Sequence, residues 1–350
     1  MIVKEALGVL EALEKNKKMN IIIPMAGRGT RLRPHTLTTP KPLIKIAGKT
    51  IVQRLVEEIS SSFDEAIDNI GFVVGDFGSE VEESLIKIAE SLGAAGHIFY
   101  QDRPLGTAHA VLCAEKIMNG SCVIAFADTL FKSDFNIKKS VDGTIWVKKI
   151  DDPSSFGVVK TDKDVVTDFV EKPDVFVSDL AIIGIYHVKE ASILKREIKF
   201  LIDNKIKDKG EYQLTNVLEN MKNKNYKFGA AEVKEWLDCG NKGATCYTNQ
   251  RVLHHQKNKL DQTSQIINCE IIEPCYIGKN NFIKDSKIGP HVSIEDNNKI
   301  EACELNNVIL QSNNDISKIN LNNSMIGSFT LIKGKHTHSQ VSIGDYTIIE

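Results

Sequence analysis

The sequence predicts an α/β protein with a mixed, mainly parallel sheet and helices on both faces, followed by a short solenoid of parallel strands. Two observations lead to this prediction. From Met19 onward, short apolar runs alternate with helical stretches, which is the pattern of a parallel sheet with crossover helices. After about residue 262 the helical patterns stop. From there an apolar residue recurs about every six positions, as in a hexapeptide-repeat parallel β-helix.

The elements of the first part follow from apolar content and periodicity. Buried strands are expected at 21–24, 70–74, 98–100 and 123–127, and helices at 51–59, 81–92 and 108–118. Ligands of open α/β sheets bind at the carboxyl ends of strands. The segments directly after strands 21–24 and 123–127 are therefore the first places to look for chemistry.

Four matched spacings support the solenoid. Each joins an Ile-Gly pair to an isoleucine six residues after the first: Ile277 to Ile283, Ile288 to Ile294, Ile326 to Ile332 and Ile343 to Ile349. The stretch 306–323 is rich in asparagine and loses this spacing, so we expect a short or irregular solenoid. A small mixed-β tail is the alternative.

Residues 1–18 form an amphipathic pattern, with Val3, Leu7 and Leu10 on one face and mostly Glu and Lys elsewhere. This segment could pack on the domain or on a second subunit, or it could be an upstream extension. The expected domains are a helical extension at 1–18, an α/β domain at 19–262 and a β-helix at 263–350.

Composition excludes several classes of protein. The 350 residues carry a net charge of -2, which gives no support for bulk binding to nucleic acid or to an anionic membrane. No transmembrane run and no secretory signal are recognisable. The seven cysteines include no CxxC pair, so we expect reduced thiols in a cytoplasmic protein.

The segment PMAGRGTRLRP (24–34) follows the apolar run 21–23 and predicts an anion-binding loop. Gly27 and Gly29 have no Cβ, so the backbone can take positive φ and approach a ligand closely. Arg28, Arg31 and Arg33 add guanidinium groups that suit phosphate oxygens. Of these, Arg33 is expected to be a solvated surface charge.

Two familiar phosphate loops are excluded. A P-loop requires GK[ST] after its spacer, and none is present here. A dinucleotide fingerprint requires a third glycine where Leu32 stands. The longer pattern GxGTRLxP followed by TTPKPLI is far more specific than GxG alone.

The stretch AGRGTRLRPHTLTTPKPL (26–43) resembles the signature of the sugar-1-phosphate nucleotidyltransferases, also called nucleotide-sugar pyrophosphorylases. The glucose-1-phosphate thymidylyltransferase and mannose-1-phosphate guanylyltransferase branches are the most similar. The resemblance runs from about Met19 to the end of the chain, because many members carry a C-terminal left-handed β-helix. It implies a Rossmann-like sheet and the reaction NTP + sugar 1-phosphate → NDP-sugar + pyrophosphate.

The resemblance assigns the phosphate contacts. Arg31 would hold the departing pyrophosphate, and Lys41 would neutralise charge at the reacting phosphate. Lys41 lies between two prolines, which would hold its backbone extended, although a rigid surface loop is the alternative reading. The loop residues implied in nucleotide binding are Ala26, Gly27, Gly29 and Thr30.

Further segments are similar to other parts of the family's site. QDRPLGTAHAV (101–111) would read the base through Gln101 and Gly106. AFADTLF (125–131) and EWLDCG (235–240) would bind Mg²⁺ through Asp128 and Asp238, although a helix cap is an alternative role for Asp128. The family more often has GDN or GDT around the first aspartate and Thr, Ile or Val at the position of Cys239.

The resemblance also implies contacts to the sugar phosphate. The segments are SSFGVV (154–159), VEKP (170–173), AIIGIY (181–186) and KGEYQLTN (209–216). The sugar-phosphate residues are Gly157, Glu171, Lys172, Gly184 and Tyr186, and the last segment contributes Glu211. The histidines at 291, 336 and 338 lie in the solenoid, where solvated loop positions are expected.

The expected partners are an NTP and a sugar 1-phosphate, with Mg²⁺ as cofactor and neither nucleic acid nor membrane. A homo-oligomer is an open possibility.

Gln101 can pair with uracil or thymine, which favours UTP or dTTP, and glucose 1-phosphate is the favoured sugar. The enzyme alternatives are a mannose-1-phosphate guanylyltransferase and an N-acetylglucosamine-1-phosphate uridylyltransferase. A regulatory subunit is the non-enzyme alternative, but such relatives typically lose the arginine, lysine or aspartates present here.

Overall fold

The computed structural model describes residues 18–27, 29–133, 140–256, 258–335 and 338–350. The chain divides into two compact units. The first comprises residues 1–27 and 55–236, and the second comprises 28–54 and 237–350. Each unit joins two separate stretches of the chain, so this division does not test the domain limits expected at 18 and 262, which stay predictions. The expected N-terminal helix lies outside the described residues.

The first unit is built on a nine-stranded sheet. Its order is β5 (Ala95–Tyr100), β4 (Ala66–Val74), β1 (Lys18–Pro24), β6 (Ser121–Ala125), β11 (Leu180–Val188), β8 (Gly143–Lys149), β12 (Phe228–Glu232), β10 (Val165–Val170) and β9 (Val158–Asp162). The first four strands are mutually parallel, whereas β11 runs antiparallel to both β6 and β8. The mixed, mainly parallel sheet predicted from the sequence is confirmed.

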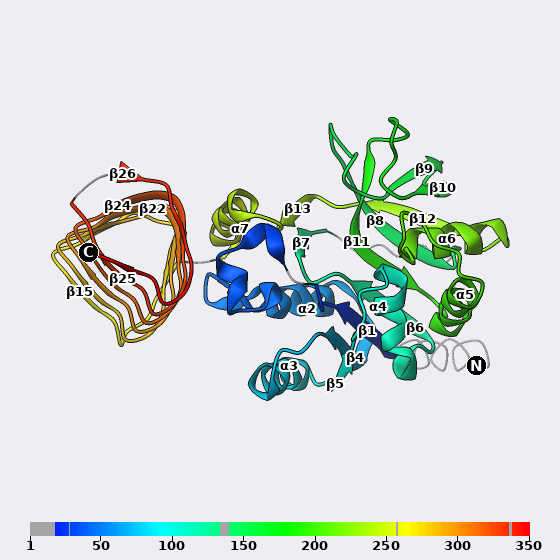
Figure 1. Ribbon diagram of the computed structural model, residues 1–350, viewed down its shortest axis with the longest axis horizontal. Coiled ribbons are helices and arrows are strands. Elements are labelled where there is room, and N and C mark those ends of the chain that lie inside the picture. The colour runs from blue at the N-terminus through cyan, green and yellow to red at the C-terminus, as the bar shows by residue number, and fades with distance from the viewer. Residues whose placement is uncertain (1–17, 28, 134–139, 257, 336–337) are drawn as a thin grey trace, which may run out of the picture. The chain divides into compact units, whose positions relative to one another are not determined.

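Helices cover both faces of this sheet. On one face, Ile22 and Ile124 belong to a buried core with α4 (Thr107–Cys113), α5 (Ala191–Asp203) and α6 (Leu214–Asn223). Figure 1 shows α5 and α6 side by side. On the other face, α3 (Ser79–Ser91) packs so closely that a Cβ on Gly96 of β5 would lie 3.0 Å from the Cα of Ile86.

The remaining elements of this part are short or cross the limit between the units. The helix predicted at 108–118 is divided into α4 and the 3-10 turn η4 (Glu115–Ile117). Helix α2 (Ile51–Ser62) begins in the second unit and continues in the first. Strand β7 (Thr129–Lys132) pairs with β13 (Glu235–Asp238).

Parallel strands of the second unit stack in three ladders. The first contains β14 (Lys259–Leu260), β17 (Cys275–Ile277), β20 (Val292–Ile294), the later halves of β22 (Glu304–Leu310) and β24 (Asn320–Ile326), and β27 (Ser342–Ile343). The second contains β15 (Gln265–Ile267), β18 (Phe282–Lys284), β21 (Lys299–Glu301), β23 (Asp315–Ser317), β25 (Leu331–Lys333) and β28 (Ile348–Ile349). The third contains β16 (Glu270–Ile271), β19 (Lys287–Ile288), the earlier halves of β22 and β24, and β26 (His338–Ser339).

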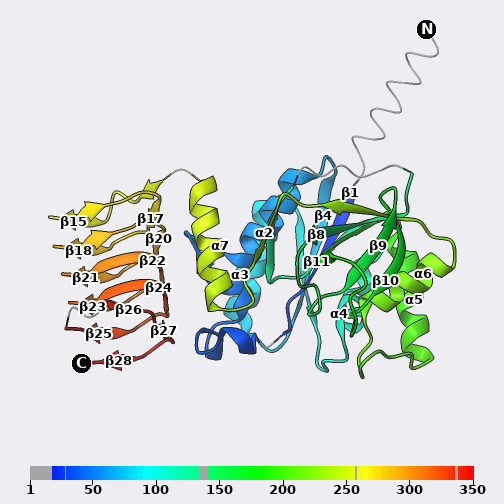
Figure 2. The ribbon, with the colours of Figure 1, turned by 90° about the horizontal axis from the view of Figure 1, so that it is seen from above.

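These ladders form the expected parallel solenoid. Ile283 pairs with Ile300, and Ile300 with Ile316, so successive coils are 17 and 16 residues long. Three strands per coil then reproduce the apolar recurrence of about six residues. Figure 1 looks along the stack of coils, and Figure 2 shows the coils from the side.

The stretch 306–323, where a short or irregular solenoid was expected, does not interrupt the strand pairing, although the coil length changes here from 17 to 16 residues. Strands β22 and β24 pair from Glu304–Asn320 through to Leu310–Ile326. Several asparagines here stand at corners, where Asn307, Asn313 and Asn323 have φ of 49°, 64° and 44°. Asparagine tolerates this left-handed conformation better than most residues, so its abundance indicates corners rather than a break.

Buried asparagines also connect one coil to the next. The backbone N–H of Asn298 donates to Oδ1 of Asn281 at 2.8 Å, and the N–H of Asn314 donates to Oδ1 of Asn298 at 2.9 Å. The N–H of Thr330 continues the series to Oδ1 of Asn314 at 2.8 Å. These side chains satisfy buried amide donors that would otherwise lack partners.

The second unit also contains the segment 28–54 and helix α7. The segment carries η1 (Thr30–Leu32), η2 (His35–Leu37), η3 (Lys41–Leu43), β2 (Lys45–Ile46) and β3 (Lys49–Thr50), and α7 spans Lys242–His255. Asn249 of α7 donates to the carbonyl of His291 at 3.1 Å and accepts from Ser293 at 2.5 Å. Among the helices of the described residues, none has the length and apolar composition needed to cross a membrane.

Candidate functional site

Three predicted site residues follow the carboxyl ends of parallel strands in the first unit. Ala26 follows β1, Gln101 follows β5 and Asp128 follows β6. Backbone hydrogen bonds join these ends: Met25 N–H to Val73 O at 2.8 Å, Gln101 N–H to Val74 O at 2.9 Å and Ala127 N–H to Pro24 O at 3.5 Å. The sheet therefore brings the loop, base and metal candidates of this unit to one edge, where ligands of such sheets bind.

Gly27 leaves open space at this edge. It is exposed, and a Cβ built on it would meet no other group within 4 Å. A ligand could therefore reach the backbone here, which is the property predicted for a phosphate-binding glycine. Arg28 lies outside the described residues.

The base-reading candidates lie together. Nε2 of Gln101 is 3.4 Å from the carbonyl of Gly106 and 3.2 Å from Nδ1 of His109. Gly106 has φ of 121°, and a Cβ there would lie 2.5 Å from the carbonyl oxygen of Tyr212. Gly106 is therefore required by its close approach to Tyr212. Neither His109 nor Tyr212 was singled out from the sequence as a site residue.

A second cluster contains the predicted sugar-phosphate residues Gly157 and Glu171. A Cβ on Gly157 would lie 3.1 Å from Oε2 of Glu171. Thr215, at the start of α6, donates from Oγ1 to the same oxygen at 2.6 Å. Sequence reasoning missed Thr215, although it quoted the segment 209–216 that contains it.

Lys172 extends this cluster towards solvent. Its exposed ammonium lies 3.7 Å from Oε1 of Glu171. Its backbone N–H donates to Phe156 O at 3.1 Å, and its carbonyl accepts from Nζ of Lys209 at 2.9 Å. The main chain of Lys172 is thus fixed while its ammonium remains accessible to an anion.

Gly184 and Tyr186 connect this cluster to the strand that precedes Asp128. The N–H of Phe126 donates to Gly184 O at 3.0 Å, and the rings of Phe126 and Tyr186 meet edge to face. Burial raises the pKa of Tyr186, and the carboxylate of Glu171 raises it further. The phenol therefore keeps its proton and can donate a hydrogen bond.

Five predicted site residues belong to the second unit: Gly29, Thr30, Arg31, Lys41 and Asp238. Of these, the structure brings Gly29 and Lys41 together. Gly29 has φ of 59°, and a Cβ there would lie 3.0 Å from the Cβ of Lys41. Oγ1 of Thr36 donates to Gly29 O at 2.8 Å. Lys41 is only 7% exposed, so the reading of a surface loop does not fit it. The other loop positions, Thr30, Arg31 and Arg33, are exposed.

Asp238 ends β13, and Gly240 makes room for its carboxylate. A Cβ on Gly240 would lie 2.7 Å from Oδ2 and 3.1 Å from Oδ1 of Asp238. The main chain is held by Thr248, whose Oγ1 donates to Asp238 O at 2.8 Å. The sequence pattern Asp-x-Gly thus has a steric reason that does not depend on Cys239.

The two aspartates have the chemistry that Mg²⁺ requires. Both are partly exposed carboxylates, and hard oxygen ligands are those that Mg²⁺ prefers. Within the described ranges, no cluster of three or more His, Cys, Asp and Glu side chains suits a metal ion. Asp128 belongs to the first unit and Asp238 to the second, so their pairing stays a prediction.

His291 has a structural partner. Its Nε2 is 2.9 Å from Nε2 of His254 on α7, and burial followed by the neighbouring His254 lowers the pKa of His291. It therefore contacts a helix and is only partly exposed. His336 and the side chain of His338 lie outside the described residues.

Comparison with known proteins agrees with this geometry. Residues 20–255 match the family described as nucleotidyl transferase. The chain is 27% identical to glucose-1-phosphate thymidylyltransferase of Streptomyces antibioticus, over 88% of this chain and 92% of that protein. It is 28% identical to the bifunctional protein GlmU of Methanococcus maripaludis, over 75% of this chain but only 62% of that protein.

A solved structure shows the same fold. The nucleoside-diphosphate-sugar pyrophosphorylase from Vibrio cholerae RC9 aligns with a TM-score of 0.57 and 19% identity, covering 66% of this chain and 99% of that chain. The family match spans β1, the glycine loop, the sheet edge and α7. The chain therefore belongs to the nucleotidyl transferase family of enzymes, among the sugar-1-phosphate nucleotidyltransferases.

Proposed function

We propose that the protein transfers a nucleotidyl group from an NTP to a sugar 1-phosphate, giving an NDP-sugar and pyrophosphate. The favoured substrates are dTTP or UTP and glucose 1-phosphate. One observation carries this proposal. In the first unit, the segment 212–215 contacts both the residues proposed to bind the nucleotide and those proposed to bind the sugar phosphate.

The contacts of this segment are specific. On the nucleotide side, the N–H of Ala108 donates to Tyr212 O at 2.9 Å and Oγ1 of Thr107 donates to Gln213 at 3.0 Å. On the sugar side, Thr215 donates to Glu171. This segment would therefore hold the proposed base-reading and sugar-reading side chains at a set spacing, as a two-substrate reaction requires.

Little covalent work is needed from the protein in this reaction. The sugar phosphate is already ionised at neutral pH, and its oxygen attacks the α-phosphorus in line while pyrophosphate leaves opposite. Arg31 and the loop amides would hold the pyrophosphate, Lys41 would meet charge at the α-phosphate, and Lys172 would hold the incoming phosphate. The rate then depends on positioning and on neutralisation of charge.

Asp128 and Asp238 would hold Mg²⁺ in this proposal. When bound, the ion would neutralise phosphate charge and orient the reacting groups. The room that Gly240 leaves beside the carboxylate of Asp238 is consistent with a role of this carboxylate as a metal ligand.

Two arguments support the proposed base and sugar. The amide of Gln101 offers a donor and an acceptor to uracil or thymine, and the similarity to the thymidylyltransferase extends over 92% of that protein. A mannose-1-phosphate guanylyltransferase and an N-acetylglucosamine-1-phosphate uridylyltransferase are the rivals. A cytoplasmic location belongs to the same proposal, supported by free thiols such as Cys122 and Cys303.

A pyrophosphate-release assay tests the proposal. The full chain is incubated with Mg²⁺ and with each of the common NTPs, paired in turn with glucose, mannose and N-acetylglucosamine 1-phosphates. We expect the highest kcat/KM with dTTP or UTP and glucose 1-phosphate. Preference for GTP with mannose 1-phosphate would assign the rival activity, and silence with every pair would favour a regulatory subunit.

A further inference from the structure

The solenoid contacts the segment that carries the proposed phosphate-binding residues. We call residues 29–48 the phosphate segment, because it contains Gly29, Arg31 and Lys41. It belongs to the same compact unit as the solenoid. The contacts lie on both sides of Lys41 in the sequence, three and four residues away, at Thr38 and Lys45.

The first group of contacts centres on Glu295. The N–H of Gly48 donates to Oε1 of Glu295 at 2.9 Å, and Nζ of Lys45 lies 3.9 Å from Oε2. The side chain of Glu295 is only 1% exposed. Its carboxylate therefore contacts the tight turn between β2 and β3 directly, without bulk water around it.

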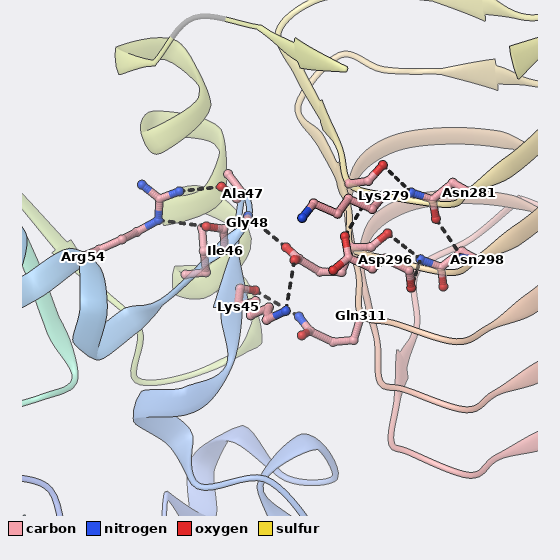
Figure 3. A network of polar contacts seen from close by, with 12 residues as sticks. Lys45, Ile46, Ala47, Gly48, Arg54, Lys279, Asn281, Asp296, Asn298 and Gln311 are labelled. Carbon is pink, nitrogen blue, oxygen red and sulfur yellow. Dashed lines mark hydrogen bonds and ion pairs between the residues drawn. The ribbon is translucent and has the colours of Figure 1, made fainter. Parts of the chain in front are cut away.

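Neighbouring groups complete this contact. Nε2 of Gln311 donates to Lys45 O at 2.9 Å (Figure 3). The ring of Tyr276 covers Gly48 so closely that a Cβ there would lie 2.4 Å from Cζ. Arg54 donates to the carbonyls of Ile46 and Ala47 at 2.8 and 2.6 Å. A main-chain group of each residue from 45 to 48 is thus held by a hydrogen bond to a side chain.

The second group of contacts lies before Lys41. His35 is buried, and its Nε2 is 3.0 Å from Oγ of Ser342. Thr38 donates a hydrogen bond to the carboxylate of Asp345. A Cβ on Gly344 would lie 2.9 Å from the Cβ of Pro34. The chain is therefore fixed against the solenoid on both sides of the lysine.

A buried carboxylate is an expensive way to hold a turn. Removing a charge from water costs several kcal/mol, and an apolar replacement of similar volume is often neutral or stabilising. What Glu295 provides to this turn is directional. Its oxygens specify where the Gly48 amide and the Lys45 ammonium lie.

We propose that Glu295 is a positioning residue of the transfer reaction. Through its contacts with Gly48 and Lys45, Glu295 holds the backbone that follows Lys41 against the solenoid and so sets the position of Lys41. This inference rests on the proposed function, since it assigns Lys41 a role at the α-phosphate. It gives the solenoid a part in the reaction that is separate from any role in assembly.

The test uses the full chain with Glu295→Ala, Glu295→Gln and Gln311→Ala. The control is Glu301→Ala, which removes a solenoid glutamate whose cation partner is Lys299 at 3.1 Å. Hydrogen exchange of peptides covering 44–50 reports the anchoring, kcat and KM for the NTP report the reaction, and circular dichroism reports the fold. If Glu295→Ala does not fold, Glu295→Gln and Gln311→Ala still test the proposal through the same measurements.

We expect Glu295→Ala to speed exchange in 44–50 and to lower kcat on the order of 10- to 100-fold, because small displacements of a catalytic group have effects of this size. KM for the NTP should change much less. Glu295→Gln should be intermediate, because an amide oxygen can still accept from Gly48. The Glu301→Ala control should match the parent in exchange and in kcat.

The two proposals fail in different ways. An active parent whose kcat survives in every Glu295 and Gln311 variant would overturn the role of Glu295. Unchanged exchange in 44–50 would overturn the anchoring itself, whatever the activity. A parent that turns over no NTP and sugar phosphate pair would overturn the proposed function, and with it the catalytic meaning of the anchoring.

Discussion

Gly29 packs directly against the side chain of Lys41. The two residues are twelve positions apart, yet a Cβ on the glycine would come within 3.0 Å of the lysine's Cβ and 3.1 Å of Cγ2 of Thr36. The glycine also occupies the left-handed region, with φ of 59°. The glycine loop and the lysine are therefore one packed structure, and a change in either is expected to reach the other.

A pair of glycine variants separates packing from ligand approach. Gly29→Ala should lower the free energy of unfolding by about 1–2 kcal/mol from its left-handed backbone alone, and should lower kcat by displacing Lys41. Gly27→Ala has no neighbour within 4 Å, so it should unfold like the parent and only raise KM for the NTP. Denaturant unfolding and steady-state kinetics measure these effects. Equal stability of the two variants would contradict the packing argument.

Lys41 is expected to act on the transition state. Lys41→Ala should lower kcat on the order of 10² to 10³, about 3 to 4 kcal/mol, as for loss of one preorganised charge-stabilising group. Arg33→Ala is the matched control, because Arg33 is an exposed cation of the same segment, and it should change kcat less than twofold. A Lys41→Ala protein within a few-fold of the parent would remove the assigned role.

Thr215 is expected to orient Glu171 for the sugar phosphate. Thr215→Val keeps the shape and removes a hydrogen bond to a carboxylate, which is worth about 1.5–3 kcal/mol. KM for the sugar phosphate should rise about tenfold or more, with KM for the NTP little changed. Thr167→Val is the control, since Thr167 bonds Asp168 at 2.9 Å on the exposed surface. Equal effects on both substrates would mean that Thr215 acts generally on folding.

Gly240 is expected to control metal binding through Asp238. Gly240→Ala would place a methyl group 2.7 Å from Oδ2, so the carboxylate must move. The Mg²⁺ concentration for half-maximal activity should rise on the order of tenfold, as for changes beside a metal ligand. Gly243→Ala, whose Cβ meets only Asn241 Oδ1 at 3.5 Å, should leave that concentration unchanged. Unaltered Mg²⁺ dependence in Gly240→Ala would exclude Asp238 as a ligand.

Glu295 gives stability a pH dependence of known sign. Burial raises its pKa from 4.5 to about 7, against the opposing effects of the Gly48 amide, Lys45 and Arg54, and Asp296 raises it further. The folded protein then binds this proton more tightly than the unfolded chain. Stability from this group is fully present below pH 4.5 and falls as pH rises to about 7.

The comparison with Glu295→Gln isolates this effect. The variant has no proton to lose, so its unfolding free energy relative to the parent should increase between pH 4.5 and about 7 and then level off. Burial lowers the pKa of His35 from 6.5 to about 4, which gives the opposite slope, but both proteins share it and it cancels. Chemical denaturation at several pH values measures the difference. A constant difference across this range would contradict the assignment.

Local pattern predicted much of the fold. The strand preceding the glycine loop became β1, and 123–127 overlaps β6, because buried parallel strands read as continuous apolar runs. The glycines at 106 and 157 were identified by resemblance, and the structure supplies their physical reason in Tyr212 and Glu171. The strands are encoded over a few neighbouring residues, whereas the physical reason for Gly106 lies far along the chain, at Tyr212.

Long-range contacts could not be read in this way. Thr215 meets Glu171 across 44 positions, and Gly48 meets Glu295 across 247. No local spacing indicates such partners, since a buried threonine or glutamate has many structural roles. The asparagine-rich stretch was misinterpreted for a related reason. Its asparagines adopt the left-handed conformation at coil corners or accept a hydrogen bond from the next coil, and neither role is visible in the local spacing of apolar residues.

The attachment of the phosphate segment to the solenoid limits how this protein can be recombined. A cut after residue 262 looks natural along the sequence, but it would take Glu295, Gln311 and Asp345 away from a segment near the amino terminus. A chimaera that joins residues 19–262 to an unrelated solenoid would therefore need a matching surface for 34–48 as well as a sound junction. A substitution in the carboxyl-terminal coils is therefore expected to affect a segment more than two hundred positions earlier in the chain.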